Sequence, residues 1–226
     1  MVRRALAVLL LLLCGCATAP DAGGPADAAD TPGSAPPFTP PATDREKQAD
    51  YAMSFFMDAC VAHVASPGDL DRWILERGLN TLEPEVASRI LAGETGQVWS
   101  AGSPLGHFFL IVVPINPTVN KCSVWAHRAD AARLNGHFER LLKGTARKGL
   151  SVRAVSDAPI QGPGGAYRQL IYYIVKDGAE LGWVFVATTS PSEEAEIQGR
   201  LMVSPGRENQ ILAPGSPEQL EPSESP

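Results

Sequence analysis

The sequence predicts an α+β domain: helices come first, and an antiparallel sheet of five or six strands follows, with one helix inserted between strands and one helix at the C-terminal end. Two observations predict this class. Apolar residues recur at intervals of three and four between residues 44 and 93, and from residue 97 they alternate or run continuously between glycines and prolines. No repeat with a period of 20 to 50 residues occurs, which argues against a solenoid or a propeller.

Three helices are expected in the first part of the domain, over residues 44–65, 66–78 and 84–93. Thr43–Asp44–Arg45–Glu46 has the form of a capping box, in which the hydroxyl and the carboxylate bind orphan backbone amides reciprocally. Proline in the first turn and glycine after the last turn mark the second and third helices. Cys60 lies on the apolar stripe of the first helix, so we expect it to face the core.

Six strands are expected, over residues 97–101, 107–113, 121–127, 150–155, 167–175 and 181–188. Residues 107–113 are apolar almost throughout, which predicts a central position in the sheet. Asp177–Gly178, between the last two strands, is a strong hairpin signal. A helix over residues 130–149 interrupts the strands, and a final helix is expected from Ser190, which has capping chemistry, to about Leu201.

The first fifteen residues have the composition of a signal peptide. Two arginines precede an apolar run that is too short to span a bilayer core of about 30 Å. Leu13–Cys14–Gly15–Cys16 then resembles a lipobox, the processing site of bacterial lipoproteins, although the cysteine at its second position departs from the small residues usual there. The alternative is an ordinary secretory signal cleaved near Ala17–Thr18–Ala19.

The lipobox resemblance implies cleavage before Cys16 and a diacylglyceryl group, with a further acyl chain such as palmitate, on that residue. Several acyl chains together hold a protein on a membrane essentially permanently. Alanine follows the cysteine, where aspartate would be the familiar inner-membrane retention signal. We therefore expect a cell-envelope protein anchored in the outer membrane and facing the periplasm.

The two ends of the chain are poor in residues that could build a core. Residues 16–42 contain seven prolines and one aromatic residue, which predicts a disordered tether. Residues 203–226 are rich in Pro, Glu and Ser, which predicts a disordered acidic tail. Between them, residues 43–202 leave about 160 residues for folding, the size of a single domain.

The net charge excludes one class of partner. The formal charge of the whole chain is −6, and loss of two arginines with the signal peptide lowers it to −8. An acidic chain repels phosphate backbones, so no nucleic-acid partner is expected.

Cys60 and Cys122 would be the two cysteines left for the folded domain after export and lipidation. In an oxidising compartment two such cysteines tend to form a disulfide, which is our expectation. The alternative is a zinc site, because His63 and His127 lie close to them in sequence. However, His127 follows Cys122 by five residues on a predicted strand, so the two side chains would point to opposite faces. We therefore expect no metal.

No motif predicts a reaction: there is no Gly-x-Ser-x-Gly elbow and no His-Glu-x-x-His. One feature indicates binding instead. Ser123, Trp125 and His127 share one face of a predicted strand, whereas Cys122 and its alternate neighbours take the other. This face is a candidate binding surface, since an exposed tryptophan offers both apolar area and a polar group.

Several segments together resemble a family of uncharacterised proteobacterial secreted proteins and lipoproteins over about residues 50–200. The segments are Phe56–Cys60, Trp73 with Arg77–Leu79, Gly96–Trp99 and Cys122–Asp130. The resemblance implies a paired Cys60–Cys122 and an envelope location, but no activity. Pro114–Pro117 has the character of an insertion relative to that pattern.

These observations favour a non-enzymatic envelope module, without a cofactor, that binds a protein or a small ligand. The alternative is an envelope hydrolase or another enzyme whose catalytic groups come together only in the folded chain. A cleft in which titratable side chains converge would favour an enzyme, and an apolar face without such groups would favour binding.

Overall fold

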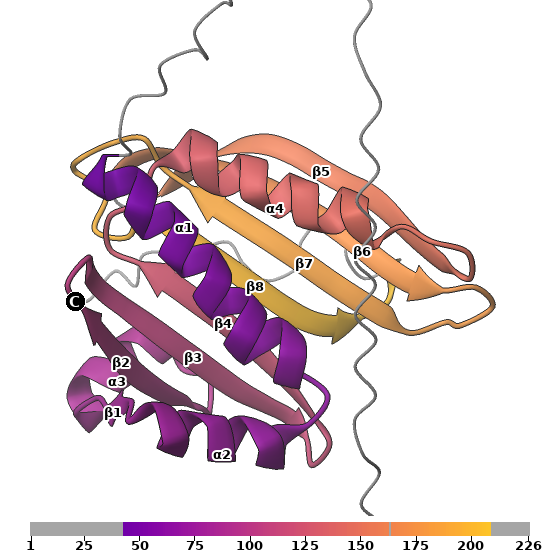
Figure 1. Ribbon diagram of the computed structural model, residues 1–226, viewed down its shortest axis with the longest axis horizontal. Coiled ribbons are helices and arrows are strands. Elements are labelled where there is room, and N and C mark those ends of the chain that lie inside the picture. The colour runs from indigo at the N-terminus through magenta and orange to yellow at the C-terminus, as the bar shows by residue number, and fades with distance from the viewer. Residues whose placement is uncertain (1–42, 163, 209–226) are drawn as a thin grey trace, which may run out of the picture. The chain divides into compact units, whose positions relative to one another are not determined.

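The structure is a computed structural model, and it describes residues 43–162 and 164–208. The predicted signal peptide, the predicted lipidation site Cys16 and the predicted tether lie outside the described residues. So does most of the predicted acidic tail, residues 209–226. The described residues form the domain between these segments, which Figure 1 shows as ribbons.

The helices of the domain are α1 (Asp44–Phe56), the π-helical turn η1 (Met57–Val61), α2 (Pro67–Arg77), α3 (Pro84–Leu91) and α4 (Ala131–Thr145). The predicted capping box is present: the Thr43 amide donates to Glu46 at 2.6 Å, and the Glu46 amide donates to the Thr43 hydroxyl at 3.3 Å. The first predicted helix is therefore confirmed, with a wider π-helical turn replacing its regular continuation at Cys60.

The strands are β1 (Asn80–Thr81), β2 (Gln97–Ser103), β3 (Gly106–Asn116), β4 (Val119–Ala126), β5 (Leu150–Gly162), β6 (Gly165–Lys176), β7 (Gly182–Thr189) and β8 (Gly199–Gly206). They form one sheet in the order β1-β2-β3-β4-β8-β7-β6-β5, and neighbouring strands are antiparallel. The last strand in the sequence thus pairs with β4 and joins the two meanders at the centre of the sheet.

The α+β class fits, but two parts of the predicted fold are wrong: the sheet has eight strands rather than five or six, and no C-terminal helix forms over residues 190–201. β1 has only two residues and gives no periodic signal. The Ser190 and Ser192 hydroxyls accept bonds from the amides two residues ahead, at 3.2 Å each, and so favour turns instead of a helix. Residues 203–206, which the sequence predicts as part of the tail, belong to β8 instead.

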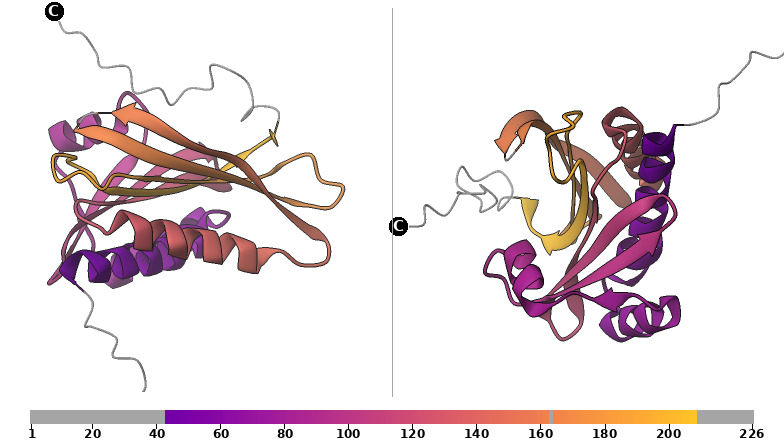
Figure 2. Two further views of the ribbon diagram at one scale, coloured as in Figure 1. Left: turned by 90° about the horizontal axis from the view of Figure 1, so that it is seen from above. Right: turned by 90° about the vertical axis from the view of Figure 1, so that its left-hand side faces the viewer.

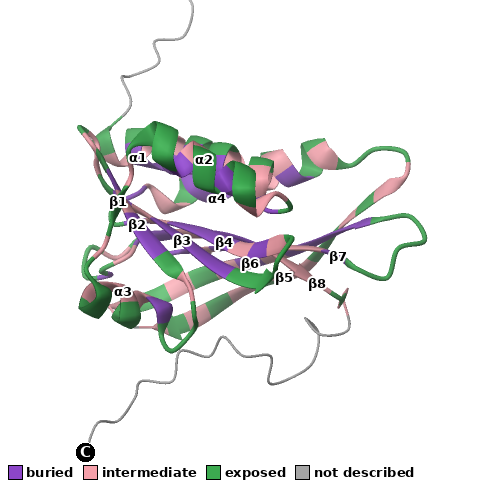
Figure 3. Ribbon diagram, turned by 90° about the horizontal axis from the view of Figure 1, so that it is seen from below, coloured by how far each residue is buried: buried purple, intermediate pink, exposed green. Residues whose placement is uncertain are grey.

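The helices divide unequally between the two faces of the sheet. α1 and α4 lie side by side on one face, together with α2 (Figures 2 and 3). Beneath them is the main core, whose fully buried large side chains include Phe56, Phe108, Phe138 and Leu201. On the other face lies α3, whose Leu91 packs in a small cluster with side chains of β2 and β3. The two faces of the sheet therefore differ in how much of their length a helix covers.

The predicted disulfide is present and ties η1 to the sheet. Cys60 and Cys122 are bonded with their Cα atoms 5.3 Å apart, and both are fully buried in the main core. Cys122 lies on β4 next to the central strand β8. The bond therefore fixes the end of the first helix to the middle of the sheet.

We predict that replacing both disulfide cysteines, as Cys60→Ala with Cys122→Ala, lowers the free energy of unfolding by about 4 kcal/mol on the chain-entropy estimate for a loop of this length. Urea unfolding of the purified, oxidised chain, with and without reductant, measures it. The double variant should be insensitive to reductant. If the unsubstituted chain has the same urea midpoint with and without reductant, the disulfide does not stabilise the fold.

Candidate functional site

The three residues of the candidate face predicted from the sequence lie on β4 and just after its last residue. Ser123 and Trp125 lie on β4 opposite the buried Cys122 and Val124, as the alternation predicts. His127 follows the last residue of β4, and its amide donates to the His107 carbonyl at 3.4 Å. The structure therefore places two of the three residues on the face of the sheet that α1, α2 and α4 do not cover, and the third at its edge.

Register extends this face across the neighbouring strands. Ser123 pairs with Met202, which pairs with Val186, and Trp125 pairs with Arg200. We call this surface the open face. It comprises Ser123 and Trp125 on β4, Arg200, Met202 and Ser204 on β8, Val184, Val186 and Thr188 on β7, Gln169, Ile171, Tyr173 and Val175 on β6, and Ser151, Arg153, Ser156 and Ala158 on β5.

The open face is apolar where a solvated sheet face would be polar. An antiparallel sheet with helices on one side normally alternates apolar residues inward and polar residues outward. Here β6, β7 and β8 place apolar side chains on both faces. Tyr173, Val175, Val186 and Met202 are only 2, 8, 9 and 6% exposed, yet the one described helix on this side, α3, covers β2 and β3 (Figure 3).

Next to α3, the open face is organised around Trp125. Its indole Nε1 donates to the Ser123 hydroxyl at 3.0 Å, and that hydroxyl donates to the Leu201 carbonyl at 2.9 Å. The guanidinium of Arg200 lies 5.0 Å from the indole centroid. Ser123 is buried, so its part is to hold the indole. Trp125, which also packs against the α3 cluster, and Arg200 are partly exposed.

At the other end of the open face, Arg153 reaches over the sheet. It pairs with Tyr173, and its guanidinium lies 5.8 Å from the tyrosine ring. The same guanidinium binds the carboxylate of Glu208 at 2.7 Å. The cations of the open face are therefore Arg153 and Arg200, one near each end, and the residues that define this face include no carboxylate.

Sequence reasoning missed most of the open face, because residues of β8 were assigned to a helix and a tail. The signal that could have found β8 is the run Leu201–Met202–Val203 ahead of Pro205–Gly206, an apolar run bounded by turn residues. A side chain on Gly199 would also approach Leu134 to 2.6 Å, which shows how closely β8 packs beneath α4.

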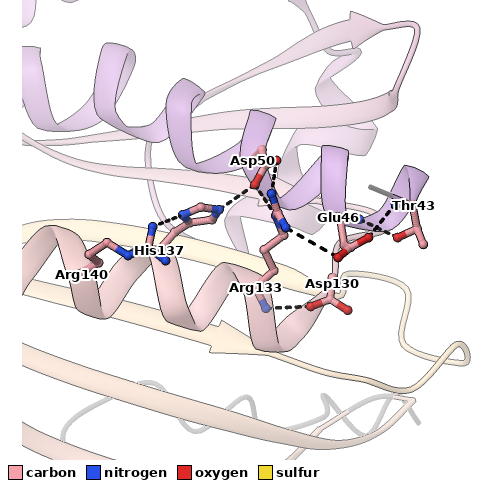
Figure 4. A network of polar contacts seen from close by, with 7 residues as sticks. All are labelled: Thr43, Glu46, Asp50, Asp130, Arg133, His137 and Arg140. Carbon is pink, nitrogen blue, oxygen red and sulfur yellow. Dashed lines mark hydrogen bonds and ion pairs between the residues drawn. The ribbon is translucent and has the colours of Figure 1, made fainter. Parts of the chain in front are cut away.

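A second group of polar residues joins α1 to α4 (Figure 4). Arg133 donates two bonds to the Asp50 carboxylate, at 2.6 and 2.9 Å, and His137 Nε2 lies 2.6 Å from the same carboxylate. Arg140 donates to His137 Nδ1 at 3.1 Å. The hydrogen bond from Arg133 is the main cause that lowers the pKa of Asp50, and the contact with His137 adds to it.

This network is the nearest the described residues come to a catalytic Asp-His pair, and its geometry argues against that role. A general base needs a free ring nitrogen beside a nucleophile. Both nitrogens of His137 are engaged, one by Asp50 and one by Arg140, and no serine or cysteine joins the contacts. We interpret the network as a clamp between two helices.

Nothing in the described chain fits a metal site: no three His, Cys, Asp or Glu side chains gather there. The disulfide occupies the two sulfurs that the zinc alternative required. His63 lies beside Trp73, with ring centroids 6.4 Å apart, and His127 is at the far end of β4 from Cys122. The two imidazoles therefore do not come together.

Two pockets of the described surface are small. One, of about 240 Å³, lies between α1 and the loop after α2, and is lined by Tyr51, Phe55 and Arg77 among others. The other, of about 310 Å³, is lined by the start of α2, where Asp69 and Arg72 form an ion pair. Pockets for drug-sized ligands measure about 300 to 1,000 Å³ and are mostly apolar, so the first of these lies below that range and the second at its lower end.

Comparisons with known proteins add no identity: neither the protein-family models nor the curated proteins include a match to this chain. None of the described helices has the length and apolar composition needed to cross a membrane. We therefore infer function from the open face and from the sequence.

We predict that Asp50→Asn lowers the free energy of unfolding by about 1 kcal/mol at pH 7, since the network is partly exposed. Because the pKa of Asp50 is lowered in the fold, its stabilisation is present above about pH 4 and is lost as the pH falls through the native pKa. Urea unfolding should therefore show a smaller difference in stability between the unsubstituted chain and Asp50→Asn at pH 3 than at pH 7.

The matched control for this measurement is Asp71→Asn on the exposed side of α2, which should change stability little at either pH. An effect of Asp50→Asn that is equally large at pH 3 and pH 7 would contradict an ionised carboxylate as the centre of the clamp.

Proposed function

We propose that this protein is a lipid-anchored lipoprotein of the cell envelope whose domain binds another envelope protein through the open face. The observation that supports binding is the apolar character of that face on β6, β7 and β8. Tyr173, Val186 and Met202 are nearly buried although no described helix lies over them, and apolar area of this kind is normally covered by another segment or protein. Trp125 and Arg200 add an aromatic and a cationic group, the residue types enriched at the energetic centres of interfaces.

A protein partner fits the open face better than a small molecule does. A row of the open face from Arg200 through Thr188 and Gln169 to β5 crosses four strands, a width of about 14 Å at the usual strand spacing. Such a surface suits the broad contact of a protein interface, which typically buries about 800 Å² on each side. The small pockets of the domain lie elsewhere, beside α1 and α2.

The anchor is proposed from the sequence. A short apolar run ends at Leu13–Cys14–Gly15–Cys16, and the two remaining cysteines form the disulfide that an oxidising compartment would favour. Residues 16–42 would separate the domain from the lipid. The resemblance to proteobacterial secreted proteins and lipoproteins supports the same location, and the alanine after Cys16 favours the outer membrane.

We predict that Cys16→Ser releases the protein from the membrane, because the acyl chains that hold it can no longer be attached. Fractionation of cells into membrane and soluble envelope contents measures this, with Cys14→Ser as the matched control that should leave the protein on the membrane. Equal membrane association of Cys16→Ser and the unsubstituted chain would rule out the anchor at this residue.

The binding face is tested with a photo-crosslinking amino acid placed at Val184 or Thr188, two partly exposed positions of the open face. In living cells both should give a crosslinked product of one defined higher mass. The same amino acid at Lys143, on the exposed side of α4, should not.

A product of twice the chain mass would identify a second copy as the partner. The absence of any intermolecular product from both open-face positions, or equal products from Lys143, would contradict the proposed function.

A further inference from the structure

We propose that residues 209–226 of this same chain bind the open face and occupy the surface to which the proposed function assigns a partner. The inference rests on the open face but not on the existence of a partner. Three observations support it: where the described chain ends, the charge of the residues after that end, and the order in which their side chains would meet the face.

The described chain ends with a side chain that faces the open face. β8 ends at Gly206, which pairs with Gly182 of β7. Two residues later, the Glu208 carboxylate binds Arg153 at 2.7 Å, and the Arg153 guanidinium lies over Tyr173 of β6. The chain after β8 therefore starts on the side of the sheet that carries the open face.

Charge complementarity favours the same arrangement. Residues 209–226 contain Glu218, Glu221 and Glu224 and no Lys or Arg. Arg153 and Arg200 give the open face positive charge, and Arg153 holds the carboxylate of Glu208, from the chain just before this segment. An acidic segment is thus attracted to the same surface that takes up Glu208.

The order of apolar and acidic residues in residues 209–226 matches the order of apolar and cationic groups along the open face. Ile211 and Leu212 come soon after Glu208, so they are the first apolar residues able to reach Val184, Val186 and Met202. The glutamates come later, when the segment can have travelled along β8 toward Arg200, about 13 Å from Ser204 at the rise of a strand. Eighteen residues reach at most about 60 Å, more than this path requires.

A segment that occupies the open face competes with any partner for it. A partner must then displace residues 209–226. Its apparent affinity equals its intrinsic affinity multiplied by the fraction of molecules in which the face is free. The partner would have to offer the same chemistry, apolar side chains followed by carboxylates. The C-terminal segment is therefore assigned the role of an intramolecular competitor.

The test measures how fast hydrogen peroxide oxidises Met202 in the purified full mature chain, relative to Met53, which is buried under the helices. Methionine oxidation follows exposure, and mass spectrometry of peptides resolves the two residues. Two variants remove the proposed contacts in different ways. One carries Ile211→Asp with Leu212→Asp, and the other carries Glu218→Lys, Glu221→Lys and Glu224→Lys.

Both variants should raise the ratio of Met202 to Met53 oxidation on the order of tenfold. The matched control makes the same change of charge in the N-terminal segment, as Asp21→Lys, Asp27→Lys and Asp30→Lys, and should leave the ratio unchanged. The ratio also corrects for any general loosening of the fold, because Met53 would then oxidise faster as well.

An unchanged ratio in both C-terminal variants, or an equal rise in the control, would overturn the proposal. The outcome is separate from that of the crosslinking experiment. If residues 209–226 do not bind, the ratio stays constant while Val184 and Thr188 can still crosslink to a partner. If no partner exists, the crosslinks are absent while the ratio still responds.

Discussion

The constraint that governs this fold is that its central strands are apolar on both faces, whereas three of the four described α-helices cover the same face. On β6 and β7, Tyr172 and Phe185 face the helices, and their neighbours Tyr173 and Val186 face the other way, all of them buried. A strand buried on both sides requires cover on both sides. α1, α2 and α4 supply it for the first face, and α3 supplies it over β2 and β3 and beside Trp125 of β4.

The helices on the covered face are held in place by contacts and a covalent bond at the centre of the sheet. β8 brings the two meanders together against β4, α1 lies over the strands at this junction, and the Cys60–Cys122 bond attaches the end of the first helix to β4. The Asp50–Arg133 pair then holds α4 beside α1. Because the helices are fixed on one face, the apolar residues of the open face need a different segment or protein to cover them.

The parts of the structure that the sequence predicts well are those with local signals. The capping box at Thr43, the disulfide cysteines and the alternation that separates Trp125 from Cys122 all depend on spacing and residue type. The strand β8 carries two conflicting signals: the short apolar run Leu201–Val203 favours a strand, and Ser190 has the chemistry of a helix cap. The turn bond of Ser190, which is seen only in the fold, decides against the helix. The open face is missed with it, since pairing across β8 brings Arg200 and Met202 beside the predicted Ser123 and Trp125.

The central claim is that the second apolar face is covered by the residues C-terminal to β8. The most direct measurement is nuclear Overhauser spectroscopy of the methyl groups of a chain that begins at residue 17. The account predicts contacts from the methyls of Val184, Val186 and Met202 to those of Ile211 and Leu212. Contacts from these methyl groups only to neighbouring residues of the sheet and to water would contradict it.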